Sequence, residues 1–231
     1  MPVQALTLDL DDTLWPVWPT IARAEAVLMD WLRAEAPATA AAHDTRSLRA
    51  LRDVVAAERP EWAHDLSAIR RESIRRALAA CGDDPALAEP AFALFFAERQ
   101  RVTLFDDVVP ALQRLAARWP IVALTNGNAD LARIGLDAHF VASLSAREFG
   151  QGKPAPAIFH AACRRAGAEP AAVLHIGDDA ELDVRGALAA GLQAAWVRRP
   201  ALAGDAAPAT DAPAAHHVVA DLLQLADRLG C

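Results

Sequence analysis

The spacing of hydrophobic positions is helical over most of the first hundred residues, and after that it alternates between strand-like runs and helical segments. Residues 3–10 form an apolar run that is typical of a buried strand. From there to about residue 101 the apolar positions recur at helical spacing, and no run rich in β-forming residues interrupts them. This pattern predicts four helices, over residues 18–35, 45–58, 65–80 and 85–100.

From residue 106 onward, short apolar runs alternate with segments of helical spacing. We predict strands over residues 121–124, 141–144, 173–176 and 193–197, helices over 107–119, 156–166 and 181–190, and a short strand and helix within 217–229. Such alternation is typical of a parallel sheet with helices on both faces. Residues 200–213 are rich in Ala and Pro, and we expect a mobile loop there.

These two patterns divide the chain into an α/β core and an α-helical insert. The first strand belongs with the later ones, so the core is predicted to comprise residues 1–15 and 102–231, and the insert residues 16–101. The core is expected to be a Rossmann-like parallel sheet. In such sheets ligands bind outside the carboxyl ends of the strands, so each chemically active cluster should lie just after a strand.

Composition and charge narrow the possible partners. Of the 231 residues 54% are hydrophobic, which is typical of a packed globular protein. A formal net charge of −7 offers no electrostatic footprint for nucleic acid or an anionic membrane, and no apolar run approaches the length of a membrane span. Without a visible signal peptide, and with three scattered cysteines, we expect a cytoplasmic protein that is a monomer or a weak homodimer.

The strongest chemical signal is the acidic cluster Asp9, Asp11 and Asp12 at the end of the first apolar run. Side chains alternate along a strand, so Asp9 and Asp11 are expected to point to the same face. Buried carboxylates at close range repel unless a cation lies between them or one takes up a proton. The pair therefore indicates a nucleophile beside a general acid/base, or oxygen ligands for Mg²⁺. Asp12 and Thr13 are interpreted as turn or cap residues.

Two further clusters have the chemistry to hold a phosphate group. Thr125, Asn126 and Gly127 follow a predicted strand, where a hydroxyl, an amide and a flexible backbone suit phosphate oxygens, although Asn-Gly is also a common turn. Lys153 is the only lysine in the chain, and it stands between a glycine and a proline. A compact positive charge at such a junction can pair with a carboxylate and a phosphoryl group.

The last cluster is again acidic and follows an apolar strand. Asp178 stands where a second metal ligand would face Asp9. Asp183 is expected within reach of Lys153 or of a metal-bound water. Glu181 is interpreted as favourable charge at a helix N-terminus, and for Asp179 this interpretation stays open beside a supporting role in the site.

One histidine and four arginines are interpreted as structural. His175 lies within a predicted strand, and we expect a core residue there rather than a metal ligand. The arginines fall on the polar side of the helix predicted over residues 65–80, where a solvated face is expected. They are Arg70, Arg71, Arg75 and Arg76.

Taken together, the four clusters resemble, in the same order, the motifs of the haloacid dehalogenase superfamily. The matching stretches are DLDDTL at 9–14, LTNGN at 124–128, GKPAP at 152–156 and GDDAELD at 177–183. The resemblance extends over nearly the whole chain, because the helical insert is similar to the type-1 cap of that superfamily. It implies a haloacid dehalogenase-like core with an inserted cap domain.

The resemblance also implies a two-step phosphatase chemistry. Asp9 would attack phosphorus and form an aspartyl-phosphate, while Asp11 would protonate the leaving oxygen and later activate water. Mg²⁺ would be held by Asp9, the backbone carbonyl of Asp11, and Asp178. The phosphoryl oxygens and the intermediate would be held by Thr125, Asn126, Gly127 and Lys153, with Asp183 and Asp179 in supporting roles.

The second acid separates two branches of the superfamily. Dehalogenases lack it, since a halide leaves without protonation, so Asp11 favours a phosphatase that acts on a small phosphorylated metabolite. Residues 125–130 and 175–197 further resemble phosphatases that act on flavin mononucleotide (FMN) and on a phosphorylated precursor of riboflavin. The alternatives are a 2-haloacid dehalogenase-type hydrolase and a receiver-like signalling module that accepts a phosphoryl group.

Overall fold

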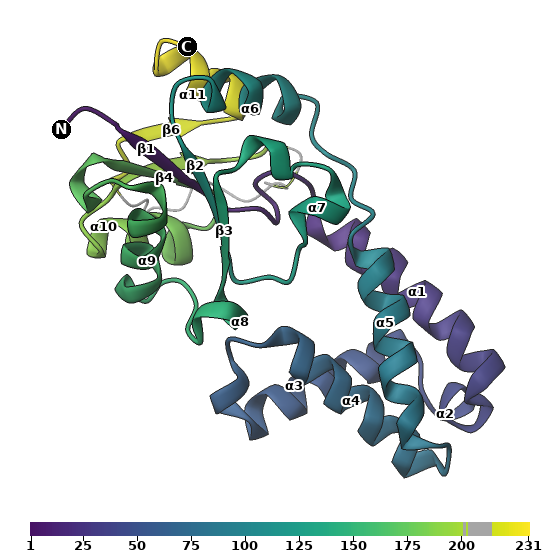
Figure 1. Ribbon diagram of the computed structural model, residues 1–231. Coiled ribbons are helices and arrows are strands. Elements are labelled where there is room, and N and C mark those ends of the chain that lie inside the picture. The colour runs from purple at the N-terminus through teal and green to yellow at the C-terminus, as the bar shows by residue number, and fades with distance from the viewer. Residues whose placement is uncertain (201, 203–213) are drawn as a thin grey trace. The chain divides into compact units, whose positions relative to one another are not determined.

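The computed structural model describes residues 1–200, 202 and 214–231, which form two compact units (Figure 1). One unit joins Met1–Pro16 to Thr103–Cys231, and the other is the continuous segment Val17–Val102. The chain therefore leaves the first unit after one strand and returns to it after a helical segment. The loop predicted over residues 200–213 falls almost entirely outside the described residues.

The larger unit is built on a six-stranded parallel sheet in the order β3-β2-β1-β4-β5-β6. Its strands are β1 (Ala5–Leu8), β2 (Ile121–Thr125), β3 (Ala142–Ser145), β4 (Val173–Gly177), β5 (Gln193–Val197) and β6 (His217–Val219). Every residue of β1, β2 and β4 is buried, as expected for strands that are covered on both faces. The predicted Rossmann-like α/β fold is confirmed.

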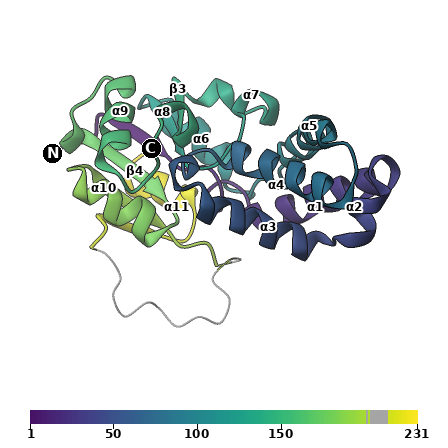
Figure 2. The ribbon, with the colours of Figure 1, turned by 90° about the horizontal axis from the view of Figure 1, so that it is seen from below.

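Helices cover both faces of this sheet (Figures 1 and 2). They are α6 (Val108–Ala116), α7 (Leu131–Ile134), α8 (Ala146–Phe149), α9 (Pro156–Ala166), α10 (Gly186–Ala189) and α11 (Leu222–Arg228), with 3-10 turns at Asp137–His139 and Pro170–Ala172. α9 packs on β1 and β2 and touches α10, whereas α6 and α11 pack together on the opposite face. Pro156 begins α9, where its missing N–H costs no helical hydrogen bond.

The strand order places β1 beside β4, although most of the chain separates them in sequence. The contact continues beyond the end of β1, since the Asp9 amide donates to the Ile176 carbonyl at 2.9 Å. The chain moves to one side of β1 through β2 and β3, and to the other side through β4, β5 and β6. Open parallel sheets hold their ligands at such a switch point, outside the carboxyl ends of the strands.

The smaller unit is a bundle of five α-helices. They are α1 (Val17–Glu35), α2 (Pro37–Ala42), α3 (Thr45–Glu58), α4 (Leu66–Cys81) and α5 (Ala88–Arg99), with 3-10 turns at Pro60–Trp62 and Pro85–Leu87. Leu28, Leu32, Leu78 and Phe95 belong to the core where α1, α4 and α5 meet. The sequence predicts four of the five helices and misses α2, a short helix that begins at Pro37, where proline fits the first turn. No helix in the described part of the chain is long and apolar enough to cross a membrane.

Three segments near the carboxyl edge of the sheet differ from the predicted elements. β1 ends at Leu8, so Asp9 and Asp11 lie in the loop that follows and not in the strand. The helix predicted over residues 181–190 is a π-helical segment, Ala180–Arg185, followed by the short α10. Lys153 does not follow a strand directly, because α8 lies between β3 and its loop. The expectation that each cluster comes just after a strand holds for the other three clusters.

Candidate active site

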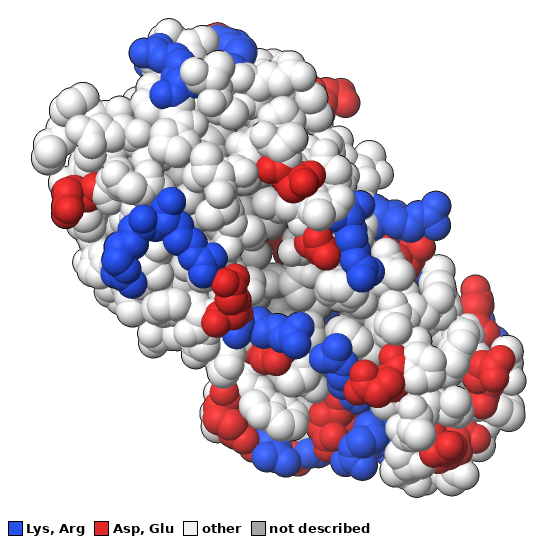
Figure 3. All heavy atoms as spheres, viewed as in Figure 1, with Lys and Arg blue, Asp and Glu red and all other residues white. Residues whose placement is uncertain are grey.

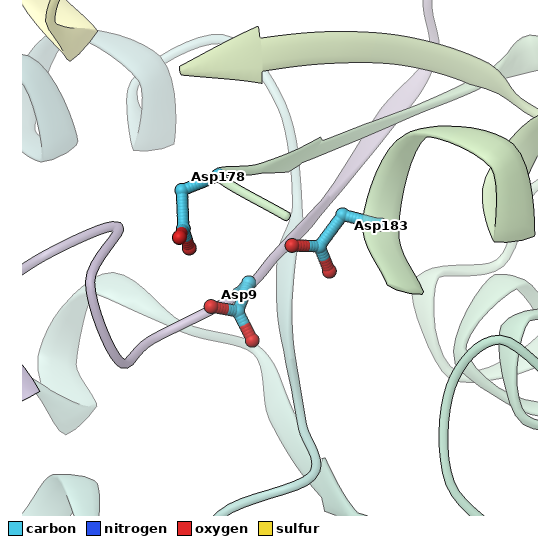
Figure 4. A group of neighbouring side chains, drawn as sticks. All are labelled: Asp9, Asp178 and Asp183. Atoms are coloured by element: carbon cyan, nitrogen blue, oxygen red, sulfur yellow. The ribbon is translucent and has the colours of Figure 1, made fainter. Parts of the chain in front are cut away.

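Three carboxylates converge at the carboxyl edge of the sheet, beside the ends of β1 and β4 (Figure 4). Asp9 follows β1 directly, Asp178 follows β4 directly, and Asp183 belongs to the π-helical segment. Each offers an oxygen atom, and these three oxygens lie within 4.8 Å of one another. Asp9 and Asp183 are buried, while Asp178 is half-buried. The structure thus brings Asp178 to Asp9, as the sequence predicts.

A single ammonium group faces these carboxylates. Lys153 Nζ lies 2.5 Å from Asp9 Oδ1 and 2.5 Å from Asp183 Oδ1, and the lysine side chain is 3% exposed. Asn126 fixes the backbone of this lysine, because its amide accepts from Lys153 N at 2.7 Å and donates to Lys153 O at 2.9 Å. A Cβ on Gly152 would lie 2.7 Å from Asn126 Oδ1, so the approach of the two loops requires glycine. The predicted reach of Asp183 to Lys153 is confirmed.

Thr13 ties the loop after β1 to the end of β4. Its buried hydroxyl lies 2.8 Å from Asp178 Oδ1 and 3.3 Å from Asp9 Oδ2, and the shorter contact is the better hydrogen bond for its single proton. The Thr13 carbonyl accepts from Arg199 Nε at 3.1 Å and from Arg199 Nη2 at 2.6 Å. Arg199 Nη1 in turn lies 2.6 Å from Asp107 Oδ1. The buried guanidinium group of Arg199 therefore holds the loop in which the Thr13 hydroxyl lies beside the carboxylates of Asp9 and Asp178.

Asp11 lies beside this group of three carboxylates and not within it. Its half-buried carboxylate accepts from Trp15 Nε1 at 2.9 Å. Asp12, the next residue, has a φ of 58°, a left-handed conformation that turns the chain between Asp11 and Trp15. Asp9 and Asp11 therefore do not share a strand face, and the expected alternation is wrong, because the strand ends before both of them.

Asp183 is held by donors on both of its oxygens. Oδ1 accepts from Lys153 Nζ and lies 3.0 Å from His175 Nε2, while Oδ2 accepts from the Asp179 amide at 3.0 Å. A Cβ on Gly177 would lie 2.3 Å from Asp183 Cγ, so only glycine allows the carboxylate to pack on this backbone. The Asp179 side chain accepts from the first amides of the π-helical segment and so caps its N-terminus.

The residues predicted to bind phosphate at the end of β2 lie at the same edge of the sheet. Thr125 is the last residue of β2, which pairs with β1, and its side chain is buried. Its hydroxyl oxygen accepts from the Gly127 amide at 2.9 Å and closes a tight turn after the strand. Both ends of the Asn126 side-chain amide form hydrogen bonds with the backbone of Lys153, so the observed contacts of Asn126 fix the loop that carries the lysine.

Burial acts to raise the pKa of all three acids, whereas neighbouring positive charge and hydrogen-bond donors act to lower it. Burial raises the pKa of Asp9 well above its usual value, against the lowering effect of the Lys153 charge. Burial, together with the charge of Asp183, raises the pKa of Asp178 to about 7. Burial would also raise the pKa of Asp183, but Lys153 and His175 hold it below its usual range.

The charge balance of the cluster fits a divalent cation. Three carboxylates face one ammonium group, so the cluster is anionic when all its members are ionised. The raised pKa values of Asp9 and Asp178 report this excess of negative charge together with burial. All the donor atoms are oxygens, the ligands that Mg²⁺ prefers, and a cation between Asp9 and Asp178 would remove their mutual repulsion.

Three residues of this neighbourhood escape the prediction from sequence. Thr13 bridges two carboxylates, although its position after an acidic run indicates only a turn or a cap. His175 contacts Asp183, although it is expected to be a plain core residue. A lone imidazole in an apolar strand is a signal that could have found it. Nothing in the sequence separates Arg199 from the neighbouring Arg198.

Known proteins resemble the chain in sequence and in fold. A family model described as haloacid dehalogenase-like hydrolase matches residues 3–191. The 5-amino-6-(5-phospho-D-ribitylamino)uracil phosphatase of Escherichia coli (strain K12) is 34% identical over 200 residues, which cover 85% of this chain and 84% of that protein. Phosphoserine phosphatase of Thermus thermophilus is 38% identical over 136 residues, 56% of this chain and 55% of that protein. The crystal structure of a 2-haloacid dehalogenase from Pseudomonas syringae pv. Tomato DC3000 matches with a TM-score of 0.88 and 38% identity over 98% of each chain.

Proposed function

The chain belongs to the haloacid dehalogenase-like hydrolase family, and on that basis we propose that it is a Mg²⁺-dependent phosphatase that acts on a small phosphorylated metabolite. Family membership, and the phosphatase class of the curated relatives, confirm the resemblance carried by the four motifs. The observation that carries the proposal is the environment of Asp9. Its buried carboxylate lies between Lys153 and Asp178 at the ligand-binding edge of the sheet, where a carboxylate can act as a nucleophile.

Two carboxylates of the chain divide the chemistry into two steps. In the first, an Asp9 oxygen bonds to phosphorus as the bond from phosphorus to the ester oxygen breaks, and Asp11 gives its proton to the leaving alcohol. In the second, the ionised Asp11 takes a proton from water, the water oxygen bonds to phosphorus, and the Asp9 carboxylate is released. The indole of Trp15 supports this assignment because its N–H holds the Asp11 carboxylate in place.

Charge neutralisation at the phosphoryl group is shared between a metal and the chain. Mg²⁺ would be held by Asp9, the backbone carbonyl of Asp11, and Asp178, and it supplies positive charge at the phosphoryl oxygens. Lys153 supplies a second positive charge beside Asp9. Thr125 adds a hydroxyl at the same edge of the sheet.

The remaining predicted residues act on Lys153 or on the local backbone. Asn126 holds the lysine backbone, and Asp183 holds its Nζ. Gly127 closes the turn that presents the Thr125 hydroxyl. The helical unit Val17–Val102, which is inserted after the loop that carries Asp11, is in this proposal the type-1 cap of the family.

The substrate proposed within this class is a phosphorylated riboflavin precursor or FMN. Its support is the Escherichia coli relative, which is named for 5-amino-6-(5-phospho-D-ribitylamino)uracil and aligns with 85% of this chain. A panel of phosphorylated metabolites that includes both compounds tests the choice. A kcat/KM for either compound well above that for phosphoserine supports it, and the reverse order contradicts it.

A dehalogenase is the second candidate, because the structure from Pseudomonas syringae bears that name and matches with a TM-score of 0.88. Asp11 separates the two activities. A halide needs no proton when it leaves, so a dehalogenase would make no use of an acid held beside the nucleophile. Chloride release from 2-chloropropionate, without hydrolysis of any phosphate ester, would establish the dehalogenase in place of the phosphatase.

The decisive experiment measures turnover of p-nitrophenyl phosphate with Mg²⁺ and with EDTA. EDTA should abolish turnover, and Asp9→Asn should lower kcat by about 10⁴-fold or more, because it removes the nucleophile. Asp11→Asn should lower kcat by about 10²–10⁴-fold. Asp12→Asn is the matched control in the same loop and should keep kcat, because Asn also tolerates the left-handed conformation. Turnover that survives EDTA or Asp9→Asn would refute the mechanism.

A further inference from the structure

A buried chain of polar side chains runs from the interior of the sheet to the Asp9 carboxylate. Thr7 Oγ1 lies 2.9 Å from His175 Nδ1, and His175 Nε2 lies 3.0 Å from Asp183 Oδ1. The same Asp183 oxygen lies 2.5 Å from Lys153 Nζ, which contacts Asp9. Thr7 and His175 are direct partners in the register of β1 and β4, so the two strands themselves place the first pair. Both side chains are at most 1% exposed.

The hydrogen-bond donors and acceptors along this row of polar side chains fix the tautomer of His175. Asp183 Oδ1 accepts from Lys153, so His175 Nε2 must carry the proton and donate to the carboxylate. Burial lowers the pKa of His175, which favours the neutral imidazole, so Nδ1 is an acceptor. The Thr7 hydroxyl then donates to Nδ1. The ring of Phe159 meets the imidazole edge-on at 5.0 Å between centroids and 90° between planes, and this packing holds the plane of the imidazole.

We propose that His175 is a positioning residue that acts through Asp183 to hold the Lys153 ammonium against Asp9, and that Thr7 supports the required tautomer by donating to Nδ1. As far as turnover is concerned, this inference rests on the function proposed above. Without the N–H of His175, Asp183 Oδ1 would keep only the lysine as a side-chain partner, and the Asp179 amide on Oδ2 would be the one remaining neutral donor that orients the carboxylate. Lys153 would then lose the fixed geometry in which one nitrogen contacts both acids.

The first test compares two replacements of His175 by steady-state kinetics on p-nitrophenyl phosphate. His175→Leu removes the donor and should lower kcat by about tenfold or more with little change in KM, as is typical when a group behind a catalytic residue is lost. His175→Gln keeps an N–H donor near the place of Nε2 and should recover most of that loss. His160→Gln is the matched control, because His160 contacts the Ala190 carbonyl and none of the polar side chains that lead to Asp9. A folded His175→Leu with the kcat of the natural protein would overturn the inference.

The second test needs no turnover and so separates this inference from the proposed function. Long-range ¹H–¹⁵N spectra of the metal-free protein should show His175 as the neutral tautomer with its proton on Nε2. Thr7→Val keeps the shape of the threonine and removes its O–H, and it should shift both His175 nitrogens and lower kcat in the same sense as His175→Leu. A proton on Nδ1 in the natural protein, or His175 nitrogens unchanged in Thr7→Val, would refute the proposed chain. If no phosphate ester is hydrolysed, the proposed function fails, and these spectra still decide the tautomer.

Discussion

Each of the two units buries carboxylates beside cationic groups, and the two clusters carry opposite excesses of charge. In the helical unit one buried carboxylate, Glu25, lies 2.5 Å from Arg49 and 3.5 Å from Arg70, so cations are in excess. In the α/β unit three carboxylates face one ammonium group, so anions are in excess. The sign of the excess indicates what each cluster needs to become neutral.

In the helical unit, aromatic side chains compensate for the excess of positive charge. Arg70 lies 3.8 Å from the centroid of the Phe95 ring, and Arg49 lies 4.4 Å from that of Trp18. An aromatic face attracts a guanidinium group, so each cation has a carboxylate and a ring as partners. Burial nevertheless lowers the pKa of Arg70 to about 10. In the α/β cluster the three acids have one ammonium group and several neutral donors as partners, and the cation proposed above would supply the missing positive charge.

Charged side chains on the outside of the molecule follow neither pattern. Over the face drawn in Figure 3, acidic and basic side chains intermix without a large area of one sign. Pairs such as Asp30 with Arg33 have side chains that are 75% and 63% exposed. Exposed pairs gain little, because water already solvates both charges. The two buried clusters therefore differ from the surface pairs because water does not solvate their charges.

The largest effect on stability is expected from Glu25→Gln. This change keeps the shape of the side chain but leaves two guanidinium groups without their carboxylate, and it should lower the free energy of unfolding by about 3 kcal/mol. Urea unfolding followed by circular dichroism measures the change. Asp53→Asn is the control, because Asp53 pairs with Arg52 on the surface and is 68% exposed. Equal losses in the two variants would show that burial of Glu25 does not matter.

Mg²⁺ should stabilise the α/β unit by a slightly smaller amount. A ligand that binds only the folded state adds about 2.7 kcal/mol when its free concentration is 100 times its dissociation constant. Thermal unfolding of the natural protein should therefore shift upward with Mg²⁺, and the shift should disappear in Asp178→Asn. Asp179→Asn should keep the shift, because the neighbouring Asp179 caps the π-helical segment and lies outside the three converging acids. A shift that survives in Asp178→Asn would show that Mg²⁺ stabilises the protein without Asp178 as a ligand, and would contradict the proposed metal site.

The same two clusters show how far sequence reasoning extends. The proximity of Asp178 to Asp9 follows from motifs at two strand ends, and that of Asp183 to Lys153 from the order of the last two motifs; the structure has both. Arg70 is predicted to lie on a solvated face, and this is wrong, because its side chain is only 13% exposed and pairs with Glu25. The polar side of a helix becomes buried when another helix packs on it, and one helix's periodicity does not contain that packing.

The fold could be predicted because the central strands of the sheet, β1, β2, β4 and β5, are local and mostly apolar runs, whereas the cross-strand contacts could not. His175 meets Thr7 only because β1 and β4 are neighbours in a defined register. Arg199 reaches the Thr13 carbonyl only because the fold places the segment after β5 beside the loop after β1. Both contacts join residues that are more than 150 positions apart in the chain, and no local pattern records them.

The smallest effect on stability is expected from breaking an exposed ion pair in the helical unit. This variant removes a charge that water already solvates, so it isolates the contribution of burial at Glu25. Asp30 and Arg33 lie one turn apart on α1 and are both mostly solvated. A double-mutant cycle with Asp30→Asn and Arg33→Gln should give a coupling energy of about 0.5 kcal/mol or less in urea unfolding. Because the same unit contains Glu25, the two measurements share one unfolding transition and one reference state. A coupling at Asp30 as large as the loss in Glu25→Gln would mean that charge pairing, and not burial, sets the stability of this unit.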